Sequence, residues 1–179
     1  MKAVVKQASR LSALSLAAIV WLTAPARGAE GVLAQQPIQY NHKVHAGKLA
    51  IDCTKCHAGT ESRQRAGFPP DLYCQACHSA PQSNSAEEAK LIDMLDDGTP
   101  LAWKQVTQVA EYVFFSHRRH VAVANIDCAV CHGDMPSRTV PIGAPFVSFR
   151  GRPGMQRCIA CHRESGSPYA GTGCVDCHR

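Results

Sequence analysis

The chain has 179 residues, of which 45% are hydrophobic and only 6% aromatic, and its formal net charge is +5. Part of this positive charge lies in the N-terminal 26 residues, and no basic patch is interleaved with aromatic side chains, so the composition does not indicate nucleic-acid binding. With 13 glycines, 11 prolines and few aromatic residues, the chain also has little material for an ordinary apolar core.

Residues 1–26 have the form of a signal peptide or a membrane anchor. Basic residues precede an apolar stretch from Leu11 to Leu22, and an Ala-x-Ala cleavage pattern ends at Ala26. The apolar stretch is short for a membrane-spanning helix, which needs about 20 residues, so we favour cleavage over retention as an anchor. In either case we expect the protein to be exported to the periplasm, with residues 27–36 as a linker.

Two copies of one stretch, 75 residues apart, follow the linker. In each copy an aromatic residue lies two positions before a His-x-x-His pair, and an Ile-Asp pair leads into Cys-x-x-Cys-His. The first copy contains Tyr40, His42, His45, Ile51, Asp52 and Cys53, and the second contains Phe115, His117, His120, Ile126, Asp127 and Cys128.

All ten cysteines fall in five Cys-x-x-Cys-His motifs, which we number 1 to 5 in chain order. The cysteines are Cys53 and Cys56, Cys74 and Cys77, Cys128 and Cys131, Cys158 and Cys161, and Cys174 and Cys177, and the histidines are His57, His78, His132, His162 and His178. This is the attachment pattern of c-type haem, in which the cysteines bond the haem and the histidine binds the iron. Disulfides, zinc ribbons and thioredoxin-like sites also use cysteine pairs, but five pairs that are each followed by histidine favour five covalently bound haem c groups.

The remaining histidines are candidates for the second axial ligand of each iron. The chain has nine histidines, and the four outside the motifs are His42, His45, His117 and His120. One of the five irons therefore has no second histidine. Met155 is our first choice for that position and Met135 the second; the alternative is an open or water-ligated iron, which would be a candidate catalytic site.

One helix is expected between the haem motifs. Residues from Ser85 to Glu88 form a capping-box pattern, and an apolar stripe at helical spacing follows at Leu91, Ile92 and Leu95. Gly98 is expected to end the helix. Met94 lies beside the stripe and is expected to pack rather than to bind iron.

We expect a small, mainly α-helical and irregular fold with a haem-packed core. Short helices at the motifs and irregular chain elsewhere fit the many glycines and prolines, and no segment shows a strand pattern of any length. The expected parts are a first haem unit with two haems over residues 37–81, a helical linker segment over 82–114, and a second haem unit with three haems over 115–179. Without haem, such a chain should be largely unfolded.

The His-x-x-His pairs before Cys-x-x-Cys-His resemble those of multihaem cytochromes of the c3/c7 type. The resemblance implies duplicated c7-like units in which the first histidine of a pair binds the haem attached just downstream. His42 would then serve motif 1 and His117 motif 3. His45 and His120 would reach other haems, those of motif 2 and of motif 4 or 5.

The stretches at residues 36–38, 42–53, 66–70, 112–117 and 161–163 further resemble the pentahaem subunit of alternative complex III. That resemblance implies electron transfer between a membrane quinol oxidoreductase with an iron–sulfur subunit and a cytochrome acceptor. The chain departs from this family in its shorter leader and in Thr107, which stands where the family tends to carry a histidine.

The sequence therefore predicts a periplasmic electron-transfer protein of a respiratory chain rather than an enzyme. The first alternative is a free periplasmic shuttle of the c7 type. The second is a small multihaem reductase that acts at one open haem iron.

Overall fold

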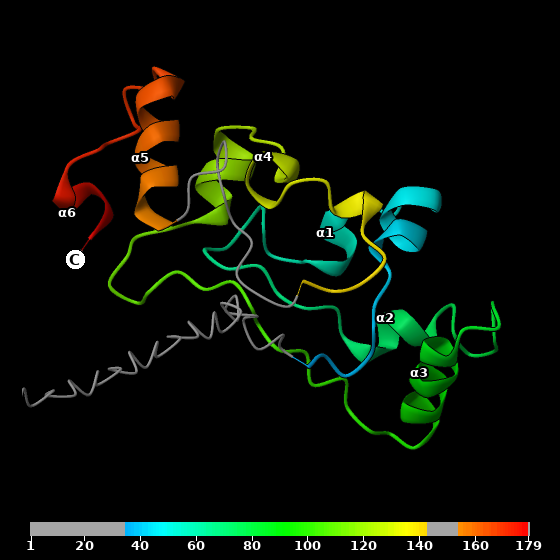
Figure 1. Cartoon of the computed structure of the whole chain (residues 1–179). Coiled ribbons are helices and arrows are strands. Elements are labelled where there is room, and N and C mark those ends of the chain that lie inside the picture. Colours follow the sequence, from blue (N-terminus) through cyan, green and yellow to red (C-terminus); the bar gives the residue numbers. More distant parts are fainter. Residues whose placement is uncertain (1–34, 143–153, 179) are drawn as a thin grey trace, which may run out of the picture. The chain divides into compact units, whose positions relative to one another are not determined.

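The computed structural model describes residues 35–142 and 154–178, so the predicted leader over 1–26 and most of the linker over 27–36 lie outside it (Figure 1). The described chain contains short helices joined by irregular segments. They are the π-helices η1 (Lys43–Lys48) and η2 (Arg119–Val123), the 3-10 helix η3 (Met135–Ser137), and the α-helices α1 (Cys53–Cys56), α2 (Asp71–Gln75), α3 (Ala86–Asp96), α4 (Cys128–His132), α5 (Gly154–Ser165) and α6 (Cys174–Cys177). The predicted mainly α-helical and irregular fold is confirmed, because the described residues form no strand beyond one isolated bridge between Val113 and His178.

The haem motifs lie at short helices, as expected. Helices α1, α4 and α6 begin at the first cysteine of motifs 1, 3 and 5, and α5 contains motif 4. Asp52 and Asp127, the acidic residues of the repeated stretch, cap α1 and α4: their Oδ1 atoms accept hydrogen bonds from the N–H of Thr54 at 2.8 Å and of Ala129 at 2.7 Å. The Ile-Asp pair of the repeat therefore starts the helical turn that presents the cysteines.

The helix expected between the motifs is α3. Its apolar stripe faces inward at Leu91, which is buried. Gly98 closes the helix in the left-handed conformation, with φ +66°, and the N–H of Thr99 bonds to the carbonyl oxygen of Met94 at 2.8 Å. This is a Schellman motif, so the glycine stop predicted from the sequence is correct.

The predicted capping box at the start of α3 is wrong. Ser85 is the N-cap residue, but its side chain makes no capping hydrogen bond. Glu88 does not reach back to Ser85, because its carboxylate accepts hydrogen bonds from His78, Gln82 and Ser83 instead. The hydroxyl oxygen of Ser83 accepts from the N–H of Ser85 at 3.2 Å, so Ser83 satisfies the N-cap N–H that Glu88 was expected to bind.

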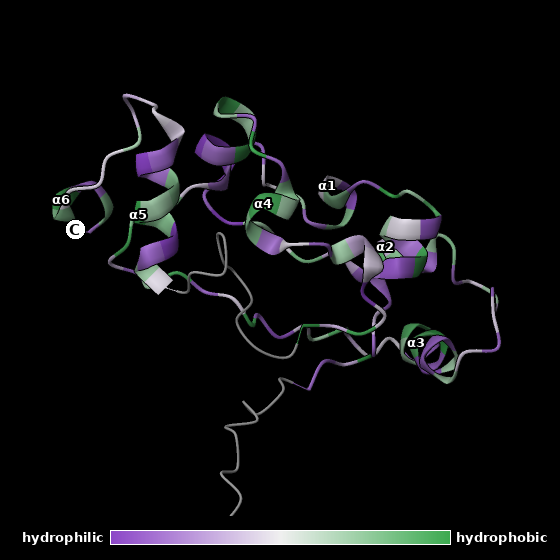
Figure 2. Cartoon of the chain, turned by 45° about the horizontal axis from the view of Figure 1, so that its top comes forward, coloured by the Kyte–Doolittle hydropathy of each residue, from purple (hydrophilic) through white to green (hydrophobic). Residues whose placement is uncertain are grey.

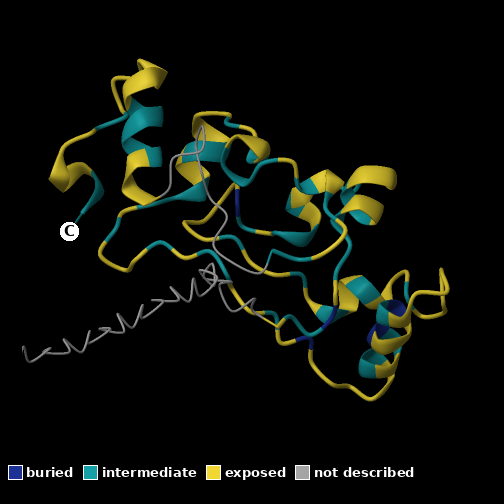
Figure 3. Cartoon of the chain, in the orientation of Figure 1, coloured by how far each residue is buried: buried dark blue, intermediate teal, exposed yellow. Residues whose placement is uncertain are grey.

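The apolar core of the described chain is very small. Its buried hydrophobic residues are Ile38, Leu91 and Leu101, and Met94 and Trp103 pack against them. Figure 3 shows the same scarcity, with buried segments confined to short lengths of the ribbon. Met94 thus packs against the core, as expected from its place beside the apolar stripe. Bands of apolar and polar residues follow one another along α5 (Figure 2), a helix without any buried residue.

Polar contacts join α3 to the N-terminal part of the described chain. Lys90 Nζ donates to the carbonyl oxygen of Pro37 at 2.6 Å, and the Glu87 carboxylate accepts from the N–H of Gln39 at 2.7 Å. The predicted linker segment over 82–114 therefore packs on the first haem unit, and the predicted unit boundaries stay a prediction. Among the helices of the described residues, none is both long and apolar enough to cross a membrane.

Candidate functional site

The two copies of the repeated stretch fold into matching wide helical turns. In the first copy the N–H of Leu49 bonds to the carbonyl of Val44 at 2.9 Å, and in the second the N–H of Ala124 bonds to that of Arg119 at 3.0 Å. These are i to i−5 hydrogen bonds, which define π-helical turns, and such turns are frequent at functional sites. The sequence repeat is therefore also a repeat of backbone structure.

An aromatic ring orients the two histidines of each pair. The Tyr40 ring stacks on His45 at 4.5 Å between centroids and meets His42 edge-on at 4.8 Å. In the second copy Phe115 stacks on the second histidine at 4.9 Å and meets the first edge-on, also at 4.9 Å. Because one imidazole lies face-on and the other edge-on to the same ring, the two histidines of a pair point to different partners.

Three of these four histidines face a motif histidine. The ring centroids are 6.5 Å apart for His117 and His132, 6.2 Å for His120 and His162, and 6.1 Å for His45 and His78. Imidazole nitrogens lie about 2.0–2.1 Å from a metal ion in proteins, so two rings that share one metal lie about 6 Å apart between centroids. The three pairs therefore have the separation that one iron between two histidines requires.

His42 lies next to His57 of motif 1. Burial, followed by the nearby His57 and His45 rings, lowers the pKa of His42 to about 4. The ring is therefore neutral near pH 7, which is the form that binds metals. Its Nδ1 is buried and has no hydrogen-bond partner among the described residues.

Most of these histidines are held at Nδ1 by a backbone carbonyl oxygen. The pairs are His45 with Asn41 at 2.9 Å, His57 with Gly67 at 3.1 Å, His117 with Gln64 at 3.0 Å, His120 with Ser116 at 2.8 Å, and His162 with Gly171 at 2.7 Å. A carbonyl oxygen only accepts hydrogen bonds, so Nδ1 carries the proton and Nε2 keeps a lone pair for a metal.

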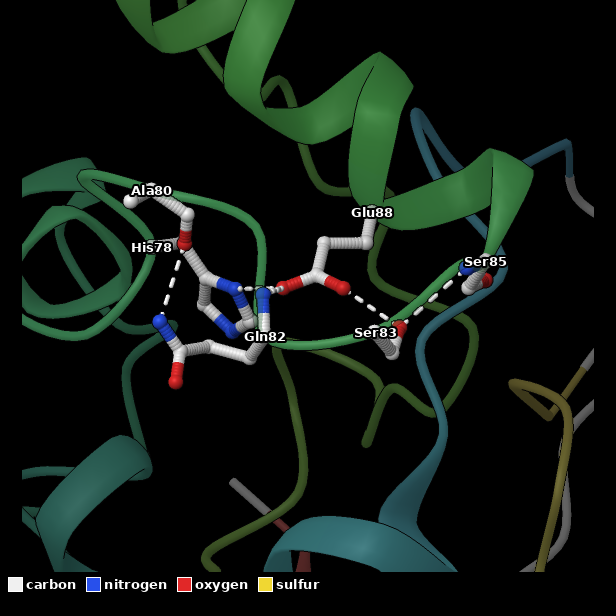
Figure 4. A network of polar contacts seen from close by, with 6 residues as sticks. All are labelled: His78, Ala80, Gln82, Ser83, Ser85 and Glu88. Atoms are coloured by element: carbon white, nitrogen blue, oxygen red, sulfur yellow. Dashed lines mark hydrogen bonds and ion pairs between the residues drawn. The ribbon is translucent and has the colours of Figure 1, made fainter.

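His78 of motif 2 is held differently, by the carboxylate of Glu88. Its Nδ1 lies 2.7 Å from Glu88 Oε1, as the dashed lines in Figure 4 show. The carboxylate also accepts from the N–H of Gln82 at 2.8 Å and from the hydroxyl of Ser83. Hydrogen bonds from Ser83, Gln82 and then His78 lower the pKa of Glu88 to about 2, so the carboxylate is ionised.

Cysteines of different motifs also lie close to one another. Burial, Asp71 and then Cys56 of motif 1 raise the pKa of the Cys74 thiol in motif 2. Burial, followed by Cys53 of motif 1, raises the pKa of the Cys128 thiol in motif 3 to about 11. Motif 1 therefore has motif 2 and motif 3 as neighbours.

Cysteines of motifs 3, 4 and 5 also lie close to cysteines of a neighbouring motif. Burial and then Cys161 and Cys158 of motif 4 raise the pKa of the Cys131 thiol in motif 3. Burial and then Cys158 raise the pKa of the Cys177 thiol in motif 5. Together these neighbours place the motifs in the order 2, 1, 3, 4, 5, which we call the motif row.

The surroundings of motif 5 differ from those of the other four. The His178 ring stacks on Tyr112 at 5.7 Å, and the N–H of Phe114 bonds to the carbonyl oxygen of Cys177 at 2.7 Å. Met155 lies in the first turn of α5 and is 56% exposed. The choice of Met155 or Met135 as an iron ligand stays a prediction.

Comparison with known proteins gives the family. Residues 113–179 match the family model described as cytochrome c7 and related cytochrome c, and residues 19–101 match the class III cytochrome c family. The chain is a multihaem cytochrome of the c3/c7 type. It is also 33% identical, over 100 residues, to the multihaem cytochrome c subunit of menaquinone reductase from Nitratidesulfovibrio vulgaris strain Hildenborough. The matched segment covers 55% of the cytochrome and 46% of that relative, so the match spans about half the relative's length.

Membership of this family implies covalently bound haem c, and the residues of this cytochrome fit it. The fit rests on the three histidine pairs at 6.1–6.5 Å, each of which joins a motif histidine to a histidine of the repeated stretch. No disulfide joins the ten cysteines, all of which lie within the described residues. When bound, haem c would supply one-electron chemistry at iron; the motif cysteines would attach it, and the paired histidines would hold its iron.

Sequence reasoning missed the residues that hold the histidines of the cytochrome in place. The aromatic position of the repeat was visible, but not that Tyr40 and Phe115 separate the two rings of each pair. Gln64 lies in a segment that carries no motif, yet its carbonyl oxygen binds His117. The sequence did single out Glu88 as a residue of the expected capping box at the helix start, but it did not predict the contact of Glu88 with His78.

Proposed function

We propose that this cytochrome binds five haem c groups and transfers electrons in the periplasm as a subunit of a membrane complex that oxidises quinol or reduces quinone. Each motif supplies two thioether-forming cysteines and one histidine to a haem. His42, His45, His117 and His120 supply the second ligand at motifs 1, 2, 3 and 4. Met155 supplies it at motif 5.

The observation that carries this proposal is the motif row together with its histidine pairs. Motifs 2, 3 and 4 each face a histidine at the separation that suits one iron. Neighbouring motifs are close enough for their cysteines to influence one another. A protein that conducts electrons requires closely spaced cofactors, and an uninterrupted row of five would carry electrons through the chain.

The membrane complex is proposed because of the relative. That protein is named as a subunit of menaquinone reductase. A partner of the same class would be a quinone-active membrane complex with an iron–sulfur subunit, and a cytochrome would be the other redox partner. The expected export signal agrees with attachment of haem c outside the cytoplasm.

Two measurements test this function. The mass of the purified mature protein should exceed that of its polypeptide by five haem groups, and fewer than five contradicts the proposed cofactor content. The native protein should also be purified from solubilised membranes, with quinone reduction or quinol oxidation followed in the same fractions. Recovery as a soluble monomer without such partners would instead support a free c7-type shuttle.

A second candidate function is suggested by His178, whose ring stacks on Tyr112 rather than on another histidine. An iron at motif 5 without a sixth ligand would leave a position for a small substrate. Reduction of such a substrate by the isolated protein, lost when ligand binding at motif 5 is blocked, is the result that favours this function over electron transfer alone.

A further inference from the structure

Glu88 is the most unusual partner of any histidine in the motif row. It lies in the first turn of α3, ten residues after His78, and the two side chains are 7% and 17% exposed. Oε1 of the carboxylate lies 2.7 Å from the Nδ1 of His78. The contact is therefore a short, largely buried hydrogen bond between a carboxylate and an imidazole.

The carboxylate is fixed by a short loop before α3. The N–H of Gln82 donates to Oε1 at 2.8 Å, and the Ser83 hydroxyl donates to Oε2 (Figure 4). The hydroxyl oxygen of Ser83 accepts in turn from the N–H of Ser85 at 3.2 Å. Glu88 thus keeps one position relative to His78, and its negative charge is shared among three donors.

No other histidine has a carboxylate partner in the hydrogen bonds of the described chain. The five other Nδ1 contacts all go to backbone carbonyl oxygens. A carbonyl oxygen is neutral, whereas Glu88 is a full negative charge in a largely buried position. The two side chains are directly hydrogen-bonded and mostly shielded from solvent, so this charge acts on the His78 ring at short range.

A carboxylate on Nδ1 makes an imidazole a stronger ligand. It draws the Nδ1 proton toward itself and so increases the electron density that Nε2 gives to a metal. More donation stabilises the oxidised iron relative to the reduced iron, and hydrogen bonding around the ligands is one of the means by which proteins set haem potentials. The proton stays on the hydrogen bond, and no bond is formed or broken.

We propose that Glu88 is a positioning residue that gives the haem at motif 2 the lowest reduction potential among the haems with two histidine ligands. The proposal rests on the proposed function, because it requires a haem at motif 2 with His78 as its ligand. Motif 2 stands at one end of the motif row, next to motif 1. Glu88 therefore makes this end the one that gives up electrons most readily to the rest of the row.

The test is a redox titration of the full-length holoprotein with two matched variants. Glu88→Gln removes the charge but keeps the size of the side chain. It should raise the reduction potential of one haem, by an amount equal to at least a tenfold change in its reduction equilibrium constant. For a one-electron couple this is about 59 mV. The control is Glu87→Gln, which removes a carboxylate from the same helical turn. The Glu87 carboxylate accepts from the N–H of Gln39 and, among the described residues, bonds to no histidine. This variant should leave the reduction equilibrium of every haem within a few-fold of wild type.

Ser83→Ala should change the reduction potential of the same haem in the opposite direction. Its hydroxyl is one of the donors that share the charge of Glu88, so its loss should leave more charge for His78 and should lower the same transition. A merely structural role of the carboxylate does not predict opposite shifts from the two variants. The low-spin electron paramagnetic resonance signal of one haem should change along with the potential.

Different results would contradict the proposed function and the role of Glu88. A wild-type protein without haem at motif 2, read from the mass of the peptide that contains Cys74 and Cys77, contradicts the proposed function. A protein with all haems whose potentials are the same in Glu88→Gln and Glu87→Gln overturns the role of Glu88. If Glu88→Gln does not retain its haems, an unchanged potential in Ser83→Ala overturns it.

Discussion

The imidazole rings of His117 and His132 face each other at 6.5 Å, with planes only 11° from parallel. His117 makes two hydrogen bonds to the carbonyl oxygen of Gln64. Its backbone N–H and its Nδ1 each donate to that oxygen at 3.0 Å. Gln64 belongs to the spacer between motifs 1 and 2. The ligand pair proposed for motif 3 is therefore held by chain from the first haem unit, so the two units share one structure around it.

Replacing His117 with methionine should raise the reduction potential of one haem. A methionine in place of one of two histidine ligands favours the reduced iron. Redox titration followed at the haem absorption bands should show one transition shifted upward in His117→Met and four unchanged. Arg118→Met places methionine at the next position and is the control; if it shifts the same transition upward by as much, His117 is not the ligand.

Replacing Tyr40 with alanine should destabilise the cytochrome and disturb two haems at once. Tyr40 is half-buried between His42 and His45. We expect a loss of about 2 kcal/mol in the free energy of unfolding, less than the roughly 3–5 kcal/mol of a fully buried aromatic residue. Chemical denaturation, followed at the haem absorption bands, measures it.

Tyr40→Phe is the matched control for this variant. Phe115 occupies the equivalent place in the second copy and makes the same stacked and edge-on contacts without a hydroxyl group. The phenylalanine variant should therefore unfold at the wild-type denaturant concentration. Equal losses in both variants would assign the effect to the hydroxyl group and not to the ring.

The local features of the fold were predictable from the sequence, whereas the partners of the histidines were not. The apolar stripe and Gly98 were sufficient to predict α3, because both act within one helix. The capping box failed because Glu88 meets stronger donors, Ser83, Gln82 and His78, in a loop whose course depends on tertiary structure. Helix patterns carry no information about such a loop.

For the proposed iron ligands too, the sequence identified the candidate residues but not their partners. Counting histidines singled out His120 as a ligand candidate, but the resemblance to c3/c7 cytochromes left open whether it served motif 4 or motif 5. In the structure its ring faces His162 at 6.2 Å. The π-helical turns that aim these rings depend on hydrogen bonds between residues five apart, for which the sequence has no specific signal.

Protein made without haem should be largely unfolded. The buried hydrophobic residues of the described chain are only Ile38, Leu91 and Leu101, and the proposed iron–histidine bonds join segments distant in sequence. Folding is then coupled to cofactor binding. Circular dichroism and limited proteolysis of the chain produced without haem attachment should show little helix and rapid cleavage compared with the holoprotein. A protease-resistant apoprotein with native helix content would contradict this.

Replacing Met155 with leucine should open the haem at motif 5. The ring that stacks on His178 is that of Tyr112 and not of a histidine. We propose Met155, three residues before Cys158 in α5, as the second ligand there. Leucine keeps the size of the side chain but removes the sulfur. The reduced wild-type protein should bind no carbon monoxide, and reduced Met155→Leu should bind one equivalent, measured by the change in its absorption spectrum. Met135→Leu is the control and should behave as wild type. One equivalent bound already by the wild-type protein would show an open iron and favour the reductase, whereas binding only by Met135→Leu would transfer the role of ligand to Met135.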